Sequence, residues 1–483
     1  MKIALSYPPL ESTKGVPLLS QNRQFQWFCE PTYIYPMVPA YAATLLKVHG
    51  YDVIWDDGIA EKKTYKKWIN DFEKNNLDLV AIETKTPVVK QHWKIINEIK
   101  EISYDTKVVL MGDHVTALPR ESMENCQVDY ILTGGDYDFL LLNLVEHLDS
   151  GKELEPGIWY RENGTIKDTG AFKLNHDLNA LPFIDRDLTK WWLYSKYNGN
   201  YKKLPGTYTM VGRDCWYHKC KFCSWTTTYP KYRTRTPESL LEEIGRLIDS
   251  YGVKEIMDDT GTFPVGSWLE TFCKGMIERG YNEKVNIHCN MRVNALNQEQ
   301  YNLMAKAGFR FILYGMESAN QETLDRINKG TKVEDIVSAC RMAKKADLDP
   351  HLTVMVGYPW EAKKDAQKTI DMAKYIFRKG WADTLQATIV IPYPGTPLFE
   401  ECKAKGLLNT YDWDRYDMRE PIMKCPMSAE EIKELTQSLY KVFMMPSYIL
   451  KRIASVRGVD DLRFIKRGVK AVFGHLTDFS LKT

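Results

Sequence analysis

The chain alternates apolar segments with amphipathic segments in two separate series, and this pattern limits the fold more than any other feature. In residues 1–150, apolar stretches such as "KIALSYPP" and "TKVVLMGDH" are separated by stretches with helical spacing, such as "PAYAATLLKVHG". Strands that are almost wholly apolar predict a parallel sheet covered by helices on both faces. We therefore expect residues 1–150 to form a doubly wound α/β domain.

The second series runs over residues 206–425 and contains six apolar segments with helical patterns between them. Six strand–helix repeats predict a partial (β/α) barrel, whose functional residues lie at the carboxyl ends of the strands. Residues 151–205 are predicted to be a connector with a hairpin, and residues 426–483 a helical tail rich in lysine and arginine. The polar residues at the predicted strand ends are Asp258, Asp259, Arg292, Glu317, Ser318 and Glu361.

The composition of the chain indicates its expected partners and its expected place in the cell. The chain of 483 residues has a net charge of +2, so global charge favours no acidic partner, and we expect no nucleic acid. The N-terminal "MKIALSYPP" lacks the length and cleavage site of a signal peptide. No stretch reaches the roughly 18 apolar residues of a membrane span. We expect a cytoplasmic protein whose ten cysteines are reduced.

Three of these cysteines are clustered in "RDCWYHKCKFCSW", with the spacing C-x4-C-x2-C: Cys215, Cys220 and Cys223. A disulfide would leave an odd thiol in a reducing compartment. A zinc site needs a fourth ligand, for which His218 is a candidate. A [4Fe–4S] cluster explains the number better, because three thiolates hold three irons and the fourth iron stays open to a ligand.

The cysteine segment resembles the radical S-adenosylmethionine (SAM) superfamily. Its usual pattern is C-x3-C-x2-C with an aromatic residue before the last cysteine, here Phe222; this chain has one additional residue between Cys215 and Cys220. The segments "IMDDTGTF", "NMRVNAL" and "YGMESANQETL" resemble later strand-end motifs. The resemblance implies a SAM site: Asp258 and Asp259 near the amino group, Arg292 near the carboxylate, and Glu317, followed by Ser318, near the ribose.

The order of the domains resembles cobalamin-binding members of that superfamily. The D-x-H-x-x-G motif, whose histidine ligates cobalt in many cobalamin proteins, is absent, since His114 directly follows Asp113. The resemblance therefore implies cobalamin without a protein histidine on cobalt. A first domain that serves only as a scaffold is the alternative. The expected cobalamin-binding residues lie in loops after the strands: Glu83, Thr84, Gly112, His114, Thr116, Gly134 and Gly135.

The resemblance implies an enzyme. The open iron would chelate SAM, one electron would cleave the sulfonium bond, and the 5′-deoxyadenosyl radical would abstract hydrogen from an unactivated carbon, which is then methylated. The stretch "CKFCSWTTTYPKYRTRTPESL" resembles members that act on lipids and tetrapyrroles, so the expected substrate is a small molecule, a lipid or a tetrapyrrole. A reductase is the expected electron donor, and the basic tail is compatible with peripheral membrane contact.

Two alternatives remain at this point. The first is radical cyclisation or rearrangement without methyl transfer. The second is a non-catalytic protein that binds iron–sulfur or zinc. The residues that contact the substrate are not assigned by the sequence.

Overall fold

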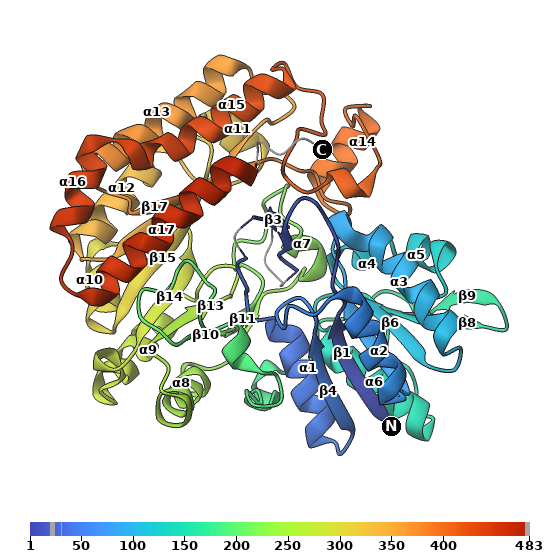
Figure 1. Cartoon of the computed structure of the whole chain (residues 1–483). Helices are drawn as coiled ribbons and strands as arrows, with labels where there is room; N and C mark the ends of the chain where they lie inside the picture. The colour runs from blue at the N-terminus through green and yellow to red at the C-terminus, as the bar shows by residue number, and fades with distance from the viewer. Residues whose placement is uncertain (20–24, 30, 479–483) are drawn as a thin grey trace.

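The computed structural model describes residues 1–19, 25–29 and 31–478. A first α/β domain lies beside a curved second α/β domain, and the C-terminal helices run along the second domain (Figure 1). The predicted fold class, a doubly wound domain followed by a partial barrel and a helical tail, is confirmed.

The sheet of the first domain has the order β4-β1-β5-β6-β7-β8-β9. The first five strands are parallel, and the hairpin β8–β9, which turns at Asn163 and Gly164, adds to β7 in the antiparallel sense. The sheet therefore extends beyond residue 150 into the predicted connector. The strands are β1 (Lys2–Tyr7), β4 (Asp52–Asp57), β5 (Leu79–Glu83), β6 (Lys107–Met111), β7 (Tyr130–Leu132), β8 (Ile158–Glu162) and β9 (Thr165–Asp168).

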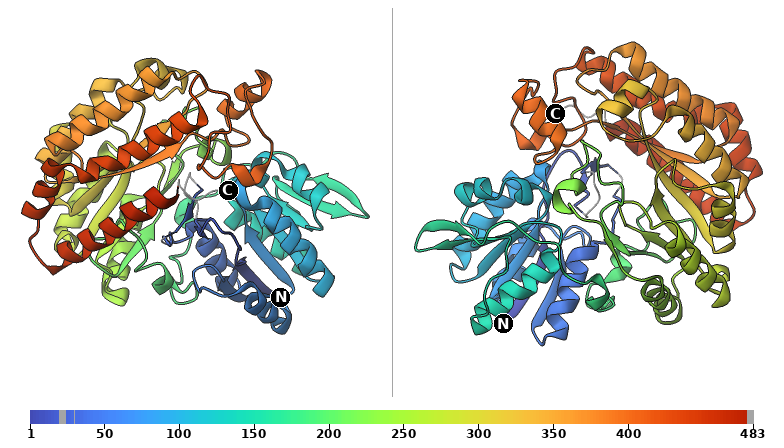
Figure 2. Two further views of the ribbon diagram at one scale, coloured as in Figure 1. Left: turned by 45° about the horizontal axis from the view of Figure 1, so that its top comes forward. Right: turned by 180° about the vertical axis from the view of Figure 1, so that it is seen from behind.

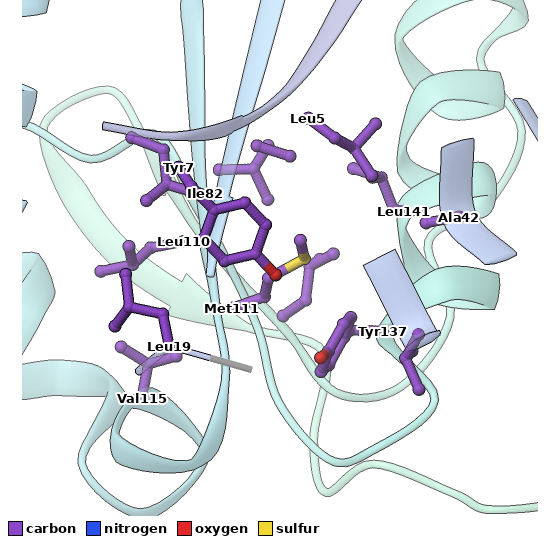
Figure 3. Packing of buried hydrophobic residues seen from close by; sticks show 14 of the residues in the cluster. Leu5, Tyr7, Leu19, Ala42, Ile82, Leu110, Met111, Val115, Tyr137 and Leu141 are labelled. Carbon is purple, nitrogen blue, oxygen red and sulfur yellow. The ribbon is translucent and has the colours of Figure 1, made fainter. Parts of the chain in front are cut away.

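Because β1 lies between β4 and β5, the chain turns in opposite directions on its two sides. Ligands of such sheets bind at the carboxyl ends of the strands near this switch point. Figure 3 shows Tyr7 at the end of β1, with Ala42 and Leu141 from the helices of one face and Val115 on the other side. The helices are α1 (Met37–Val48), α2 (Tyr65–Asn75), α3 (Val89–Ile102), α4 (Asp113–Ala117), α5 (Pro119–Asn125) and α6 (Tyr137–Ser150).

The second domain has six parallel strands in the order β10-β13-β14-β15-β16-β17. The strands are β10 (Gly206–Thr209), β13 (Glu255–Asp258), β14 (Asn286–Met291), β15 (Phe309–Glu317), β16 (Asp349–Val356) and β17 (Thr384–Ile389). The helices between them are α8 (Pro237–Tyr251), α9 (Ser267–Glu278), α10 (Gln298–Lys306), α11 (Gln321–Arg326), α12 (Val333–Lys345) and α13 (Lys363–Lys379), and α14 (Pro397–Ala404) follows β17.

The partial barrel is open between β10 and β17, and a short hairpin that the sequence did not predict lies near this opening. The hairpin joins β2 (Val16–Pro17) to β3 (Trp27–Phe28). Figure 1 shows β3 between the two domains. The Gln386 side chain on β17 donates a hydrogen bond to Oε1 of Gln26, at 3.3 Å. The N-terminal segment therefore contributes to the wall of the barrel as well as to the first domain.

The tail forms α15 (Ala429–Tyr440), α16 (Pro446–Ala454) and α17 (Val459–Asp478). The Tyr440 hydroxyl of α15 donates to the backbone oxygen of Ala387 on β17, at 3.1 Å. Arg467 of α17 donates to the backbone oxygen of Tyr201, at 2.7 Å, near the start of the barrel. Within the described residues, no helix combines the length and apolar character needed to span a bilayer.

Candidate functional site

The three clustered cysteines lie on a loop between β11 (Gly212–Arg213) and α7 (Trp225–Thr228). Two residues of this loop, Asp214 (φ 72°) and His218 (φ 54°), adopt the left-handed conformation that most side chains avoid. Nδ1 of His218 lies 2.6 Å from Oδ2 of Asp214, so the two side chains bridge the base of the loop. Of these two residues, His218 lies in the segment between Cys215 and Cys220 that is one residue longer than usual.

All three cysteines line a pocket of about 130 Å³ at the carboxyl ends of the barrel strands. Among the described residues, no group of three His, Cys, Asp or Glu side chains is arranged to hold a single metal ion. His218 lines the pocket with its Nδ1 held by Asp214, as metal-binding histidines often are, so it is the lack of a three-donor group among the described residues that argues against zinc. Three thiols are the set expected for a [4Fe–4S] cluster with one open iron.

The thiols lie among polar and cationic groups. Sγ of Cys215 is 2.9 Å from the Thr262 hydroxyl oxygen. Burial raises the pKa of Cys220, while the nearby cations Lys329 and Arg292 act in the opposite direction. Metal binding requires the thiolate and releases its proton, so the two cations favour the form that an iron would bind.

Glu317 is turned into the pocket at the end of β15. Its backbone is left-handed (φ 60°), and the register with β16 shifts between Gly315 and Glu317, as in a β-bulge. Its Oε1 accepts a hydrogen bond from Nζ of Lys329, at 2.7 Å. A Cβ atom at Gly315 would lie 2.3 Å from that same oxygen. The glycine therefore leaves the space that the buried ion pair occupies.

Arg292 follows β14 and also lines the pocket. Its guanidinium lies 3.6 Å from the ring centroid of Tyr217 in the cysteine loop, and it donates to the backbone oxygen of Gly330 at 3.2 Å. Within the described part of the chain its buried Nε has no hydrogen-bond partner. A carboxylate in the pocket could accept from this N–H, and the contact of Arg292 with the SAM carboxylate stays a prediction.

The other three predicted SAM residues do not line this pocket. Asp258 accepts hydrogen bonds from the Thr209 hydroxyl (2.8 Å) and the Val211 amide (3.0 Å), so it joins β10 to β13. Asp259 is buried beside it. The Ser318 hydroxyl lies 3.2 Å from that of Thr369 on α13. Their roles toward SAM stay predictions that this geometry does not support.

The pocket is also lined by residues that were not predicted from the sequence. Thr262 lies in the same "DDTGTF" segment, and Asn290 precedes Arg292 by two residues on β14, so alternation along the strand could have indicated it. Lys329 lies beyond a helix and carries no comparable signal. The additional lining residues include Thr226, Thr262, Asn290, Lys329, Gln386 and Tyr393.

A second group lies at the carboxyl edge of the first domain. Glu83 at the end of β5 accepts a hydrogen bond from Tyr137, at 3.0 Å, and a short one from Tyr7. Burial raises its pKa. Glu83, Gly112 and Gly135 line a narrow space of about 20 Å³ between this edge and α7. These three predicted residues of the first domain therefore face the helix that directly follows the cysteine loop.

The remaining four predicted residues of that edge contact other parts of the same domain. The imidazole of His114 lies between the Thr86 hydroxyl (3.1 Å) and the Glu121 carboxylate (3.2 Å), so both ring nitrogens are engaged. The expectation that no histidine binds cobalt stays a prediction. Thr84 contacts His92, Thr116 accepts from the Gly134 amide, and Gly134 lies against Phe172.

A buried ionic network joins the two groups across the domain boundary. Arg213, two residues before the first cysteine, donates to Asp136 at 2.8 Å and to Asp138 at 2.9 Å. Arg233 donates to Asp136 at 2.6 Å. Although burial acts to raise it, the pKa of Asp136 is lowered by these arginines. The strand that leads into the cysteine loop is thus fixed to the first domain by charge pairs.

Comparisons with known proteins give consistent similarities. Residues 210–373 match the family model of the radical SAM superfamily. The chain is 29% identical over 444 residues to an uncharacterized methyltransferase of Pyrococcus horikoshii, covering 90% of this chain and 93% of that protein. It is 27% identical over 426 residues to the anaerobic magnesium-protoporphyrin IX monomethyl ester cyclase of Cereibacter sphaeroides, covering 85% and 67%.

A solved structure resembles the whole arrangement. The radical SAM methyltransferase TsrM of Kitasatospora setae, solved with cobalamin and a [4Fe–4S] cluster, superposes with a TM-score of 0.65 at 16% identity, covering 92% of this chain and 86% of that one. At this identity the likeness concerns the fold, including the order and packing of the two domains.

Proposed function

We propose that the chain is a cobalamin-dependent enzyme of the radical SAM superfamily, whose family model matches residues 210–373, and that it methylates an unactivated carbon. The observation that carries the proposal is the convergence of three thiols, Glu317 and Arg292 on one pocket beside the first domain. The similarity over most of both chains to a methyltransferase, and the fold shared with TsrM, support methyl transfer and cobalamin.

The residues of the pocket have distinct proposed roles. Cys215, Cys220 and Cys223 would hold three irons, and Arg292 and Glu317 would bind the carboxylate and ribose of SAM. When bound, the cluster supplies one electron at low potential and cobalamin supplies a carrier for a methyl group. Phe222 and Tyr393 add apolar walls to the pocket, and a dry pocket protects a reactive radical from side reactions.

The edge of the first domain is the proposed place for cobalamin. It lies at the ligand-binding end of a doubly wound sheet, it faces α7, and its glycines let a ligand approach the backbone. The space measures about 20 Å³. A ligand as large as cobalamin would therefore displace α7 from the edge.

The substrate class, electron donor and location are finer proposals. Similarity to a protein named for a magnesium-protoporphyrin ester supports a tetrapyrrole or another small apolar molecule as substrate. A separate reductase would supply the electron, and a cytoplasmic location stays a prediction.

Reconstitution tests the cofactors. The protein is incubated without oxygen with iron, sulfide and hydroxocobalamin, desalted, and analysed for metals. We expect about four irons and about one cobalt per chain. Cys220→Ala should lose the cluster absorbance and all SAM cleavage, whereas Cys29→Ala, at an exposed cysteine outside the loop, should keep both. SAM cleavage that survives Cys220→Ala would refute the cluster assignment.

Product analysis tests the reaction. Methyl transfer from SAM produces S-adenosylhomocysteine, and radical generation produces 5′-deoxyadenosine. We expect both from the reconstituted enzyme with its substrate. Formation of 5′-deoxyadenosine alone would favour cyclisation or rearrangement and contradict the methyltransferase proposal.

A further inference from the structure

The short helix α16 exposes apolar side chains to solvent. Leu450 is 67% exposed, Ile453 is 65% exposed, and Ile449 is also exposed. Ile453 lies four positions after Ile449 and three after Leu450, and residues three and four apart lie on one side of a helix, so the three form a continuous apolar strip. Single exposed apolar residues are ordinary, but a contiguous strip marks an interaction site.

The next helix, α17, repeats the arrangement and adds cations to it. Val459, Leu462 and Val469 are more than half exposed. Spacings of three and seven residues place them on one face. Lys466 lies between Leu462 and Val469 on that same face and is exposed, as is Lys470 beside it. The face is therefore apolar along its centre and positively charged between and beside the apolar side chains.

The charge of this segment departs strongly from that of the chain. Residues 444–470 carry seven lysines and arginines against two aspartates, in a protein whose net charge is +2. Both aspartates are already paired, Asp461 with Lys202 and Asp460 with Arg463. The excess positive charge is thus concentrated on the two helices that expose apolar side chains.

A pocket of about 430 Å³ lies beside α17, where the helix passes the connector. Its lining includes four cations and two aromatic side chains and contains no aspartate or glutamate. Arg467 is fixed there by its hydrogen bond to the Tyr201 backbone, and Lys62 lies 4.6 Å from the ring centroid of Tyr197. The cations of the lining are Lys62, Lys196, Arg467 and Lys470.

We propose that α16 and α17 form a docking surface for a membrane containing anionic lipids, and that the adjacent pocket accepts a lipid phosphate group. Helices that combine an apolar strip with lysine and arginine lie in the interfacial region of such membranes. Each cation near an anionic surface contributes about 1 kcal/mol. Figures 1 and 2 show the two helices on the outside of the barrel.

Vesicle sedimentation tests the proposal with the full chain and does not depend on the cofactors. Vesicles of phosphatidylcholine alone are compared with vesicles that also contain phosphatidylglycerol. We expect the protein to sediment with the second kind only, and less so as sodium chloride is raised. Failure to sediment with either kind would overturn the proposal without affecting the proposed reaction.

Matched variants locate the surface. Leu450→Gln/Ile453→Gln should abolish sedimentation, and Lys466→Gln/Lys470→Gln should weaken it at least about fivefold for each cation. These side chains are exposed, so the melting temperature should not change. The controls Val48→Gln on α1 and Lys364→Gln on α13, both exposed, should sediment as the parent chain does.

Other occupants of the surface are distinguished in the same series. Light scattering that shows a dimer, lost in Leu450→Gln/Ile453→Gln, would identify a second copy as the partner and overturn the proposal. Binding of inorganic phosphate without vesicle sedimentation would assign the pocket to a small anion and likewise overturn it. Sedimentation that is equal in all variants would place the contact elsewhere.

Discussion

At the scale of single residues, the ion pair between Glu317 and Lys329 is the most consequential charge contact of the proposed site. Both side chains are about nine-tenths buried, with Nζ and Oε1 2.7 Å apart. Removing one partner of a buried pair leaves an uncompensated charge and costs about 3–5 kcal/mol. We therefore expect Lys329→Met to lower the free energy of unfolding by this amount, measured by urea denaturation.

The double variant Lys329→Met/Glu317→Gln tests the cause. If the isolated charge is responsible, the second change should restore much of the lost stability, and the two effects will not add. The exposed pair of Lys405 and Glu401 is the control, since breaking it should cost less than about 1 kcal/mol. Strictly additive effects in the double variant would contradict this account.

A second prediction concerns Glu361, which follows β16. Burial raises its pKa to about 7, against 4.5 for an ordinary glutamate, although the Gly357 amide donates to it at 3.3 Å. A carboxyl whose pKa is raised by folding stabilises the protein fully below its unfolded pKa, and this contribution is lost as the pH rises through the folded value.

The contribution of Glu361 to the free energy of unfolding should therefore fall as the pH rises from 4.5 to about 7, by up to about 3 kcal/mol at about 1.4 kcal/mol per pKa unit. The Glu361→Gln variant should lack this decline, while Glu299→Gln, at an exposed position, should keep it. Urea denaturation at several pH values measures the difference. Parallel curves for the parent chain and Glu361→Gln would show that this carboxyl is not responsible.

At the scale of elements, the cysteine loop depends on the contact between Asp214 and His218. With this contact at 2.6 Å, we expect His218 to close the loop and not to act as a metal ligand. We expect His218→Ala to keep three thiols capable of taking up iron but to lose iron faster, because the loop is less ordered. Iron content against time after desalting measures this. The control is Lys219→Ala, at an exposed neighbouring residue.

A complete loss of iron in His218→Ala, equal to that in Cys220→Ala, would instead indicate that the histidine is a ligand. Iron retention equal to that of the Lys219→Ala control would show that the bridge is not needed for the longer loop.

The existence and order of the helices and strands could largely be predicted from the sequence, whereas the contacts of their side chains could not. Long strands such as β15 and helices such as α13 have a clear apolar period, so their existence and order could be predicted. The two-residue strands β2 and β3 are too short for any period. The sequence placed Asp258 at a strand end correctly, but the side to which it points depends on the neighbouring strand. Lys329 reaches Glu317 only through the tertiary fold.

At the scale of the whole molecule, buried charge pairs hold the boundary between the domains together, while the proposed entry of cobalamin requires part of that boundary to open. Arg213, Asp136 and Asp138 form a buried network across it, which should hold the cysteine loop in place. Asp136→Asn would leave two arginines, Arg213 and Arg233, with one carboxylate fewer. We expect a loss of about 3–5 kcal/mol in unfolding free energy and earlier proteolysis between the domains, whereas Asp249→Asn on the exposed side of α8 should change neither.

The closed part of the same boundary lies at Tyr229, whose ring occupies the space next to Gly135. A Cβ atom at Gly135 would lie 1.8 Å from that ring, and the remaining space of about 20 Å³ is far smaller than the few hundred Å³ of a cofactor site. Cobalamin that enters here must move this tyrosine. We therefore expect hydrogen exchange in residues 225–229 to change when hydroxocobalamin is added.

Tyr229→Leu should make entry easier by removing the part of the ring that blocks the edge. Cobalt retained after desalting should be reached at lower hydroxocobalamin concentration than in the parent chain, while iron content stays the same because the thiols are untouched. The exposed Tyr411→Leu is the matched control and should behave as the parent. Gly135 and Tyr229 belong to different domains, so unchanged cobalt retention in Tyr229→Leu would place the cobalamin site away from this boundary. Absence of cobalt in both proteins would leave the first domain as a scaffold for a radical enzyme that uses SAM alone.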